Sequence, residues 1–327
     1  MELKPLMFDT GPMAPRRTVI HPTPAPQAAA RLAPLLVVAS IVGIQFGQAW
    51  GKSLFGELTP LGVVALRLGF AAIVMLAVIR PRAPADRGEW LVVIGLGMAI
   101  AGMNLFIYPA LDRLPVGVAV TFQFLGPFAV ALVGSRRWLD AVWAVLACAG
   151  VVLFVVPDTP TSPLSWLGIV FALLSGASWA AYIVVNKHAG NKTGTPAALA
   201  LAVACAAAVT VPVGLVTDGA ALVGSGRIVL IGLAIAVISA VIPYLLDWLA
   251  LRRISARLFG VLGSLEPAIG ALAAAVLLTE QLSVSQTVAV ALVVTASVCA
   301  SATDRERADT DRPAGQERCS DTRFGGA

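Results

Sequence analysis

The sequence predicts an all-α integral membrane protein with ten transmembrane helices, arranged as two inverted five-helix repeats. Three observations lead to this fold class. The chain of 327 residues is 58% hydrophobic and only 13% charged, about half the charge of a soluble domain. Its apolar residues form ten runs, each near the roughly 20 residues that a helix needs to cross a bilayer. A shift of 140 residues also superposes a loop and a run of one half on a loop and a run of the other.

The chain begins with a proline-rich, basic leader, residues 1–32, for which we expect a disordered cytoplasmic segment. Ten apolar runs follow, with approximate bounds 33–51, 60–79, 90–110, 115–134, 138–156, 166–186, 196–216, 227–249, 257–278 and 283–302. The first five form a predicted first repeat, residues 33–157, and the last five a second repeat, residues 158–302. Residues 303–327 are polar and charged, which predicts a disordered cytoplasmic tail.

The positions of lysine and arginine predict the orientation in the membrane. With a cytoplasmic N-terminus, 19 of the 23 basic residues fall in inward segments and 3 in outward segments, while Arg67 lies inside the second run. Short cytoplasmic loops carry such an excess, so both termini are expected inside the cell. Because the charges lie in gaps between apolar runs, the net charge of +5 does not indicate a nucleic-acid partner.

An internal repeat supports the inverted arrangement. Residues 110–132 and 250–272 are identical at seven of 23 positions, including Arg113 with Arg253 and Pro127 with Pro267. Five runs separate the two copies, and an odd number turns the second copy upside down. Inverted repeats are typical of secondary transporters, whose substrate site lies near the midplane where the halves meet.

Glu266 is the strongest candidate for a functional residue, because it lies in the middle of the ninth run, directly before Pro267. A carboxylate at membrane depth costs roughly 2.5–3.5 kcal/mol on insertion scales, and proline removes a backbone donor beside it. Glu266 either couples transport to protons or cations, or only bonds neighbouring helices and the backbone that Pro267 frees.

Two further charged residues lie within the runs, Asp247 and Arg67. Asp247 either helps Glu266 to recognise an ammonium group or pairs with Arg252 or Arg253. Arg67 either binds a carboxylate in bidentate fashion or is the internal partner of one of the acids. Both pairs of alternatives stay open at the level of the sequence.

Neutral polar side chains on several runs predict a wet central cavity that orients a small polar ligand: Gln45, Asn104, Tyr108, Gln123 and Tyr182. Tyr244, three residues before Asp247, joins these substrate-site candidates. Interhelical hydrogen bonding explains any one of them alone.

The first run carries two further features. Its glycines Gly43, Gly47 and Gly51 recur at four-residue spacing and give a smooth face for close helix packing. Lys52, at the outer end of this run, either extends to the lipid headgroups or takes part in a gate.

Several stretches together carry a family resemblance: GKSLF (51–55), ALRL (65–68), GMN (102–104), GPFAVAL (126–132) with SRR (135–137), PY (243–244) and FGVLGSLEPA (259–268). With them the chain resembles the ten-helix drug/metabolite transporter (EamA-type) superfamily, and within it the branch that exports small neutral amino acids such as threonine and homoserine. The resemblance covers nearly all of residues 33–302. It implies export across the inner membrane by alternating access and proton exchange, through a central cavity lined by runs three, four, eight and nine.

The resemblance also carries over individual residues: Arg67, Asn104, Arg257, Glu266 and Pro267. The chain departs from the branch at Gln123, where the exporters that it resembles have a glutamate. Asp247 keeps an acid at a second position. Glu266 is therefore the main carboxylate expected near the midplane.

Two alternative functions remain beside the amino-acid exporter. An exporter of drugs or other amphipathic metabolites would favour a more aromatic cavity than these runs offer. An intramembrane enzyme is disfavoured because HExxH, GxSxG and a histidine within the runs are all missing.

We expect no cofactor and no metal, since His21 and His188 lie outside the runs. The expected partners are a small-molecule substrate, protons and the lipid bilayer, and a homodimer is compatible with the sequence.

Overall fold

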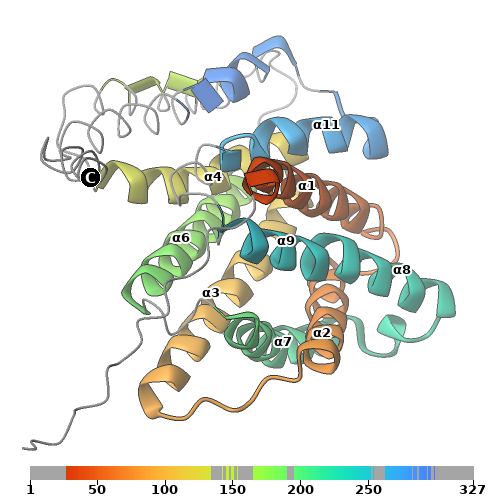
Figure 1. The fold of residues 1–327 in the computed structure, drawn as a ribbon. Coiled ribbons are helices and arrows are strands. Elements are labelled where there is room, and N and C mark those ends of the chain that lie inside the picture. The colour runs from red at the N-terminus through yellow and green to blue at the C-terminus, as the bar shows by residue number, and fades with distance from the viewer. Residues whose placement is uncertain are drawn as a thin grey trace, which may run out of the picture.

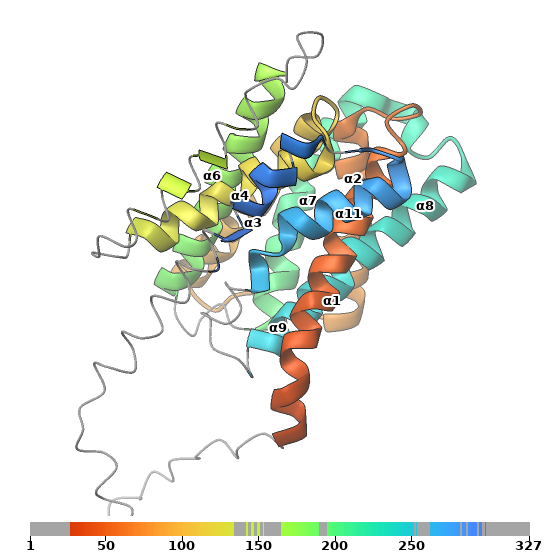
Figure 2. The ribbon, with the colours of Figure 1, turned by 90° about the horizontal axis from the view of Figure 1, so that it is seen from above.

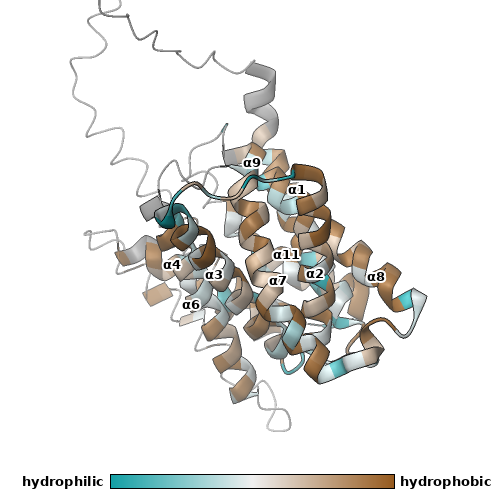
Figure 3. Ribbon diagram, turned by 90° about the horizontal axis from the view of Figure 1, so that it is seen from below, coloured by the Kyte–Doolittle hydropathy of each residue, from teal (hydrophilic) through white to brown (hydrophobic). Residues whose placement is uncertain are grey.

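The computed structural model describes residues 27–133, 165–189, 195–251, 262–281, 283–285 and 287–292, together with scattered residues between 142 and 153 and at 253, 294, 295 and 298. Every regular element within this part of the chain is helical (Figure 1). Among the described residues, six helices are long and apolar enough to cross a membrane. Hydrophobic residues dominate the helices, and hydrophilic ones gather at helix ends and connections (Figure 3). The predicted all-α, multi-pass membrane fold is confirmed at this level.

The helices follow the predicted apolar runs closely. The first half contains α1 (Gln27–Lys52), α2 (Pro60–Ile79), α3 (Arg87–Leu111) and α4 (Val116–Val133). The second half contains α6 (Trp166–Ala189), α7 (Pro196–Asp218), the short 3₁₀ helix η2 (Gly219–Leu222), α8 (Gly226–Ala236), the π-helical segment η3 (Val237–Val241), α9 (Ile242–Leu251) and α11 (Glu266–Leu278). α8, η3 and α9 form one continuous helical segment. The fifth predicted run lies largely outside the described residues, and the tenth is described in part.

Local sequence explains where these helices begin. Thr59 caps α2 by accepting a hydrogen bond from the Gly62 amide, with Pro60 at the first helical position. Thr195 and Pro196 start α7 in the same way. A threonine cap followed by proline satisfies a free amide and fixes a helical φ angle. α1 begins at Gln27, inside the predicted leader, because three alanines follow that favour a helix.

The helices pack as a bundle in which the two halves interleave (Figures 1 and 2). α2 packs against α7, and α4 packs against α11. α3 contacts both α6 and α7, and α1 contacts both α9 and α11. α4 also contacts α6, and α2 contacts α8. Every helix of the first half that is described thus packs against helices of the second half.

Glycines allow the closest of these approaches. A β-carbon built on Gly126 of α4 would collide with the carbonyl oxygen of Gly176 on α6, so the two backbones touch. On α1, a β-carbon at Gly43 would lie 2.7 Å from the Ile238 carbonyl oxygen, and one at Gly47 would collide with Ser239. The predicted packing role of the glycine face of α1 is confirmed.

We predict that Gly126→Ala destabilises the bundle, because its methyl group meets main-chain atoms that no rotamer change can move. Overpacking of this kind typically costs about 1–3 kcal/mol. The measurement is the thermal unfolding midpoint of the detergent-solubilised protein. Gly56→Ala is the control, since a β-carbon there meets nothing within 4 Å. An unchanged midpoint for Gly126→Ala would contradict the backbone contact.

Candidate functional site

Arg67 is a buried cation in the middle of α2, with only 3% of its surface exposed. Its Nε donates to Ser239 Oγ at 2.8 Å, and one terminal nitrogen donates to the Ser239 carbonyl oxygen at 2.7 Å. The other terminal nitrogen donates to Asn104 Oδ1 on α3. The guanidinium carbon also lies 6.0 Å from the centre of the Tyr108 ring. Neutral acceptors from both halves therefore fix the orientation of this cation.

The π-helical segment explains why a main-chain carbonyl is available to Arg67. In a π-turn the amide bonds to the carbonyl five residues earlier instead of four, and such turns are frequent at functional sites. Ser239 lies within this segment, and its hydroxyl donates in turn to the Ile235 carbonyl oxygen at 2.7 Å. We infer that the widened turn presents the Ser239 carbonyl to α2. Ser239 was not among the residues predicted from the sequence.

Glu266 is the first residue of α11, and it is buried. The residues just before it form a turn, so the helix is interrupted beside the acid, as its proline neighbour predicts. Gln45 Nε2 on α1 donates to Glu266 Oε2 at 3.4 Å. The oxygen of this amide, Gln45 Oε1, has no hydrogen-bond partner among the described residues. It lies 3.2 Å from a β-carbon built on Gly270, one turn further along α11.

Asp247 and Tyr244 connect Glu266 to Arg67. Asp247, half-buried on α9, lies near Ser40 of α1 and near Glu266. Tyr244, one turn before Asp247, lies near both Asp247 and Arg67. These contacts place the two acids and the cation in one polar cluster in the core.

The structure thus gathers most of the predicted site residues into one cluster, which we call the core cluster: Arg67, Asn104, Tyr108, Tyr182, Tyr244, Asp247 and Glu266, with Gln45. Tyr182 of α6 joins it through Tyr244 and Asp247. Arg257, taken from the resemblance, lies outside the described residues.

Gln123 has a different environment from the core cluster. Its Nε2 donates to Ser175 Oγ at 2.7 Å, and that hydroxyl donates to the Met103 carbonyl oxygen at 2.7 Å. These bonds join α4, α6 and α3 beside the contact of Gly126 with Gly176. Gln123 satisfies its amide by linking helices, which is the ordinary role of such a residue in a membrane core.

The charges of the core cluster have no counter-charges among the described residues. Within the part of the chain that the structure describes, no opposite charge lies within ion-pairing distance of Arg67, Asp247 or Glu266. The described Arg253 does not pair with Asp247, and neither acid is the internal partner of Arg67. An uncompensated charge in a low-dielectric core costs several kcal/mol. The arrangement therefore favours a ligand that supplies charges of its own.

Unsatisfied neutral atoms adjoin these charges. Besides Gln45 Oε1, the Tyr108 hydroxyl and Gln48 Oε1 are buried without a hydrogen-bond partner among the described residues. Gln48 lies one helical turn after Gln45 on α1, and it too was missed from the sequence, although a polar residue within an apolar run is a visible signal. Buried polar atoms are normally bonded, so these are available to a ligand.

A multi-pass helical membrane protein with unpaired charges of both signs in its core has the features of a small-molecule carrier. Residues 166–302 match the EamA-like transporter family. The threonine/homoserine exporter RhtA of Salmonella typhimurium strain SL1344 is 36% identical over 272 residues, covering 83% of this chain and 92% of that protein. RhtA of Escherichia coli K12 is 35% identical over 273 residues, with the same coverage. The chain belongs to the EamA-like transporter family, as its sequence motifs predict.

The fold has a counterpart among solved structures. A crystal structure of a protein with 19% identity superposes with a TM-score of 0.60, covering 85% of this chain and 99% of the other. At this identity the likeness shows a shared fold alone.

We predict that Ser239→Ala lowers the free energy of unfolding by about 1.5–3 kcal/mol, the usual contribution of a hydrogen bond to a charged group. The substitution removes the acceptor of the Arg67 Nε–H and leaves a charged donor unsatisfied. The measurement is thermal unfolding in detergent. Thr210→Val is the matched control, because Thr210 Oγ1 is buried without a described partner and its loss should cost little. Equal effects of the two variants would contradict the role of Ser239.

Proposed function

We propose that this protein exports small neutral amino acids of the threonine and homoserine type across the inner membrane. Two relatives described as threonine/homoserine exporters, 35–36% identical over 83% of the chain, support this substrate class. The observation that carries the proposal is the core cluster, where the buried Arg67 and Glu266 and the half-buried Asp247 form no ion pair among the described residues.

Arg67 is suited to hold the substrate carboxylate. A guanidinium has five N–H donors in a planar fork, and its bonds to Ser239 and Asn104 use three of them. One N–H remains on each terminal nitrogen, which is the pair that binds a carboxylate in bidentate fashion. The Tyr108 ring lies 6.0 Å from the guanidinium carbon, and its hydroxyl has no partner among the described residues.

Glu266 and Asp247 are suited to receive the ammonium group. An amino acid is a zwitterion, so a site with a cation at one end and carboxylates at the other complements both of its charges. Gln45 Oε1 and Gln48 Oε1 are acceptors without described partners and can bind the hydroxyl that threonine and homoserine share. A larger apolar drug would leave these polar atoms unsatisfied.

Proton exchange follows from the free-energy cost of holding ionised, unpaired carboxylates in the core. With the site empty, a proton on Glu266 removes a charge that the core does not compensate. An arriving ammonium group favours the ionised form, so the substrate displaces the proton. Alternating exposure of the site to the two sides of the membrane then exchanges amino acid for proton.

We further propose ten membrane spans in two inverted halves, residues 33–157 and 158–302, with both termini cytoplasmic. The helix contacts support a pseudo-twofold relation. α3 packs on α6 and α7 as the α8–α9 segment packs on α1 and α2, and α4 packs on α6 as α11 packs on α1. Ser175 donates to the carbonyl of Met103, and Ser40 donates to the carbonyl of Pro243, which is 140 residues further on.

We predict that proteoliposomes containing the protein catalyse counterflow: vesicles preloaded with unlabelled threonine or homoserine take up the labelled amino acid faster than empty vesicles. Counterflow requires binding and alternating access but no ion gradient, so it tests the substrate class directly. Arg67→Met, which removes the carboxylate partner, should lower the rate at least about tenfold, the effect of losing 1.4 kcal/mol. Counterflow of a cationic dye without counterflow of either amino acid would support the drug exporter instead.

We predict that Glu266→Gln abolishes accumulation driven by a pH gradient while retaining part of the counterflow, because Asp247 still receives the ammonium group. The measurement compares the two assays in the same proteoliposomes. Glu57→Gln is the control, since this acid is exposed at the protein surface, where it pairs with Arg227. Full gradient-driven accumulation by Glu266→Gln would rule out Glu266 as the proton carrier.

A further inference from the structure

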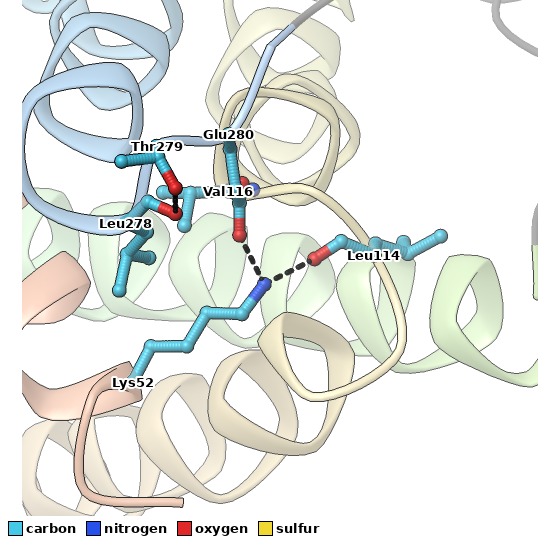
Figure 4. Close-up of polar contacts among 6 residues, drawn as sticks. All are labelled: Lys52, Leu114, Val116, Leu278, Thr279 and Glu280. Carbon is cyan, nitrogen blue, oxygen red and sulfur yellow. Dashed lines mark hydrogen bonds and ion pairs between the residues drawn. The ribbon is translucent and has the colours of Figure 1, made fainter.

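Lys52, the last residue of α1, is fixed by two strong bonds. Its Nζ donates to Glu280 Oε1 at 2.6 Å and to the Leu114 carbonyl oxygen at 2.9 Å (Figure 4). The second oxygen of the acid, Glu280 Oε2, accepts from the Val116 amide at 2.9 Å. We call this group the clasp: Lys52, Glu280 and the junction 114–116 between α3 and α4. Lys52 therefore does not simply extend to the headgroups.

The clasp is more buried and more fully hydrogen-bonded than an ordinary surface ion pair. The side chains of Lys52 and Glu280 are only 19% and 20% exposed, and each carboxylate oxygen has its own donor. Lys52 stands at the C-terminus of α1, and the carboxylate stands at the N-terminus of α4, where the helix dipoles favour these charges. Exposed pairs contribute little because solvent screens them, whereas this one is sheltered.

A strained turn directs Glu280 into the clasp. Thr279 ends α11 in the left-handed region, at φ 54° and ψ 21°. A β-branched residue rarely adopts this conformation, and such strain persists only where surrounding contacts enforce it, often at switch regions. In Figure 4 the chain turns after Leu278 and brings Glu280 over the start of α4.

The clasp joins the two halves above the core cluster. Lys52 and the 114–116 junction belong to the first half, and Glu280 belongs to the second. Gly51, next to Lys52, packs on Tyr108 of the core cluster: a β-carbon there would lie 3.2 Å from the tyrosine hydroxyl. The sequence repeats the residue types, with Asp140 standing 140 positions before Glu280 and Lys187 standing 135 positions after Lys52.

We propose that the clasp is a gate: it closes this end of the bundle over the core cluster in the state that the structure shows, and it opens once in each transport cycle. The inference rests on the proposed transport function. Closure joins Lys52 of α1, Glu280 after α11 and the start of α4, so opening this end breaks one ion pair and the hydrogen bond from the Val116 amide between opposite halves. Lys52 and Glu280 are thereby functional residues that do not touch the substrate.

A reversible crosslink tests whether the clasp must open. In a background with the four native cysteines replaced by serine, Lys52→Cys and Glu280→Cys are combined and bridged with a short bifunctional methanethiosulfonate. The counterflow rate of the bridged protein should fall at least about tenfold, equal to 1.4 kcal/mol. Reduction of the bridge should restore the rate. Each single-cysteine variant treated with the reagent is the control. Unchanged counterflow in fully bridged protein would overturn the proposal.

The accessibility of a buried cysteine to a thiol reagent can be measured without a substrate. It therefore separates failure of the gate from failure of the proposed substrate class. The reporter is Val120→Cys, a buried position of α4 one turn below the clasp, labelled with a membrane-impermeant thiol reagent. Lys52→Glu places like charges together and should raise the labelling rate at least about tenfold. Lys52→Glu with Glu280→Lys restores the ion pair but not the bonds to the Leu114 carbonyl and the Val116 amide, so it should reverse part of this increase. Arg227→Glu, in the exposed pair with Glu57, is the control and should change nothing. Equal labelling of all variants would refute closure by the clasp.

Discussion

The whole arrangement depends on one constraint: charge in the low-dielectric core of a membrane protein must be compensated. Arg67, Asp247 and Glu266 meet this constraint only in part. Arg67 is held by neutral oxygens of Ser239 and Asn104, and Glu266 by an amide of Gln45. None of these partners neutralises a charge, so the site is complete only with a ligand or a proton in it. A site in which these charges were permanently paired would be more stable, but it would bind neither a ligand nor a proton.

The backbone irregularities serve the same constraint. A π-helical segment at residues 237–241 presents an acceptor to Arg67, and the interruption before α11 places Glu266 at a helix start. Regular helices satisfy their own backbone groups and offer nothing to a side chain. Close glycine contacts then bring α1 against the π-helical segment and α4 against α6. Both polar anchors therefore come from breaks in otherwise regular helices, and packing between the halves holds them together.

Hydropathy alone predicted most of the fold, because a bilayer demands long apolar helices. Eight of the ten predicted runs coincide with described helices, while the other two and the repeat boundaries remain predictions. Charged residues at depth were equally visible, and Arg67, Asp247 and Glu266 do share one cluster. The hydrogen-bond and ion-pair partners of these side chains were harder to predict, since they depend on tertiary contacts. Nothing in the sequence VISAV indicates a π-turn, and no local pattern joins Lys52 to Glu280. Gln123 looked like a ligand group, yet its hydrogen bond goes to Ser175.

The central claim is that the unpaired acids exchange a proton for the ammonium group of the substrate. The most direct test is the pH change when threonine or homoserine is added to purified protein in weakly buffered detergent, recorded beside the amount of amino acid bound. The account predicts that the wild-type protein releases a proton for each amino acid bound, and that Glu266→Gln binds without release. Binding by the wild-type protein with no proton release would contradict it.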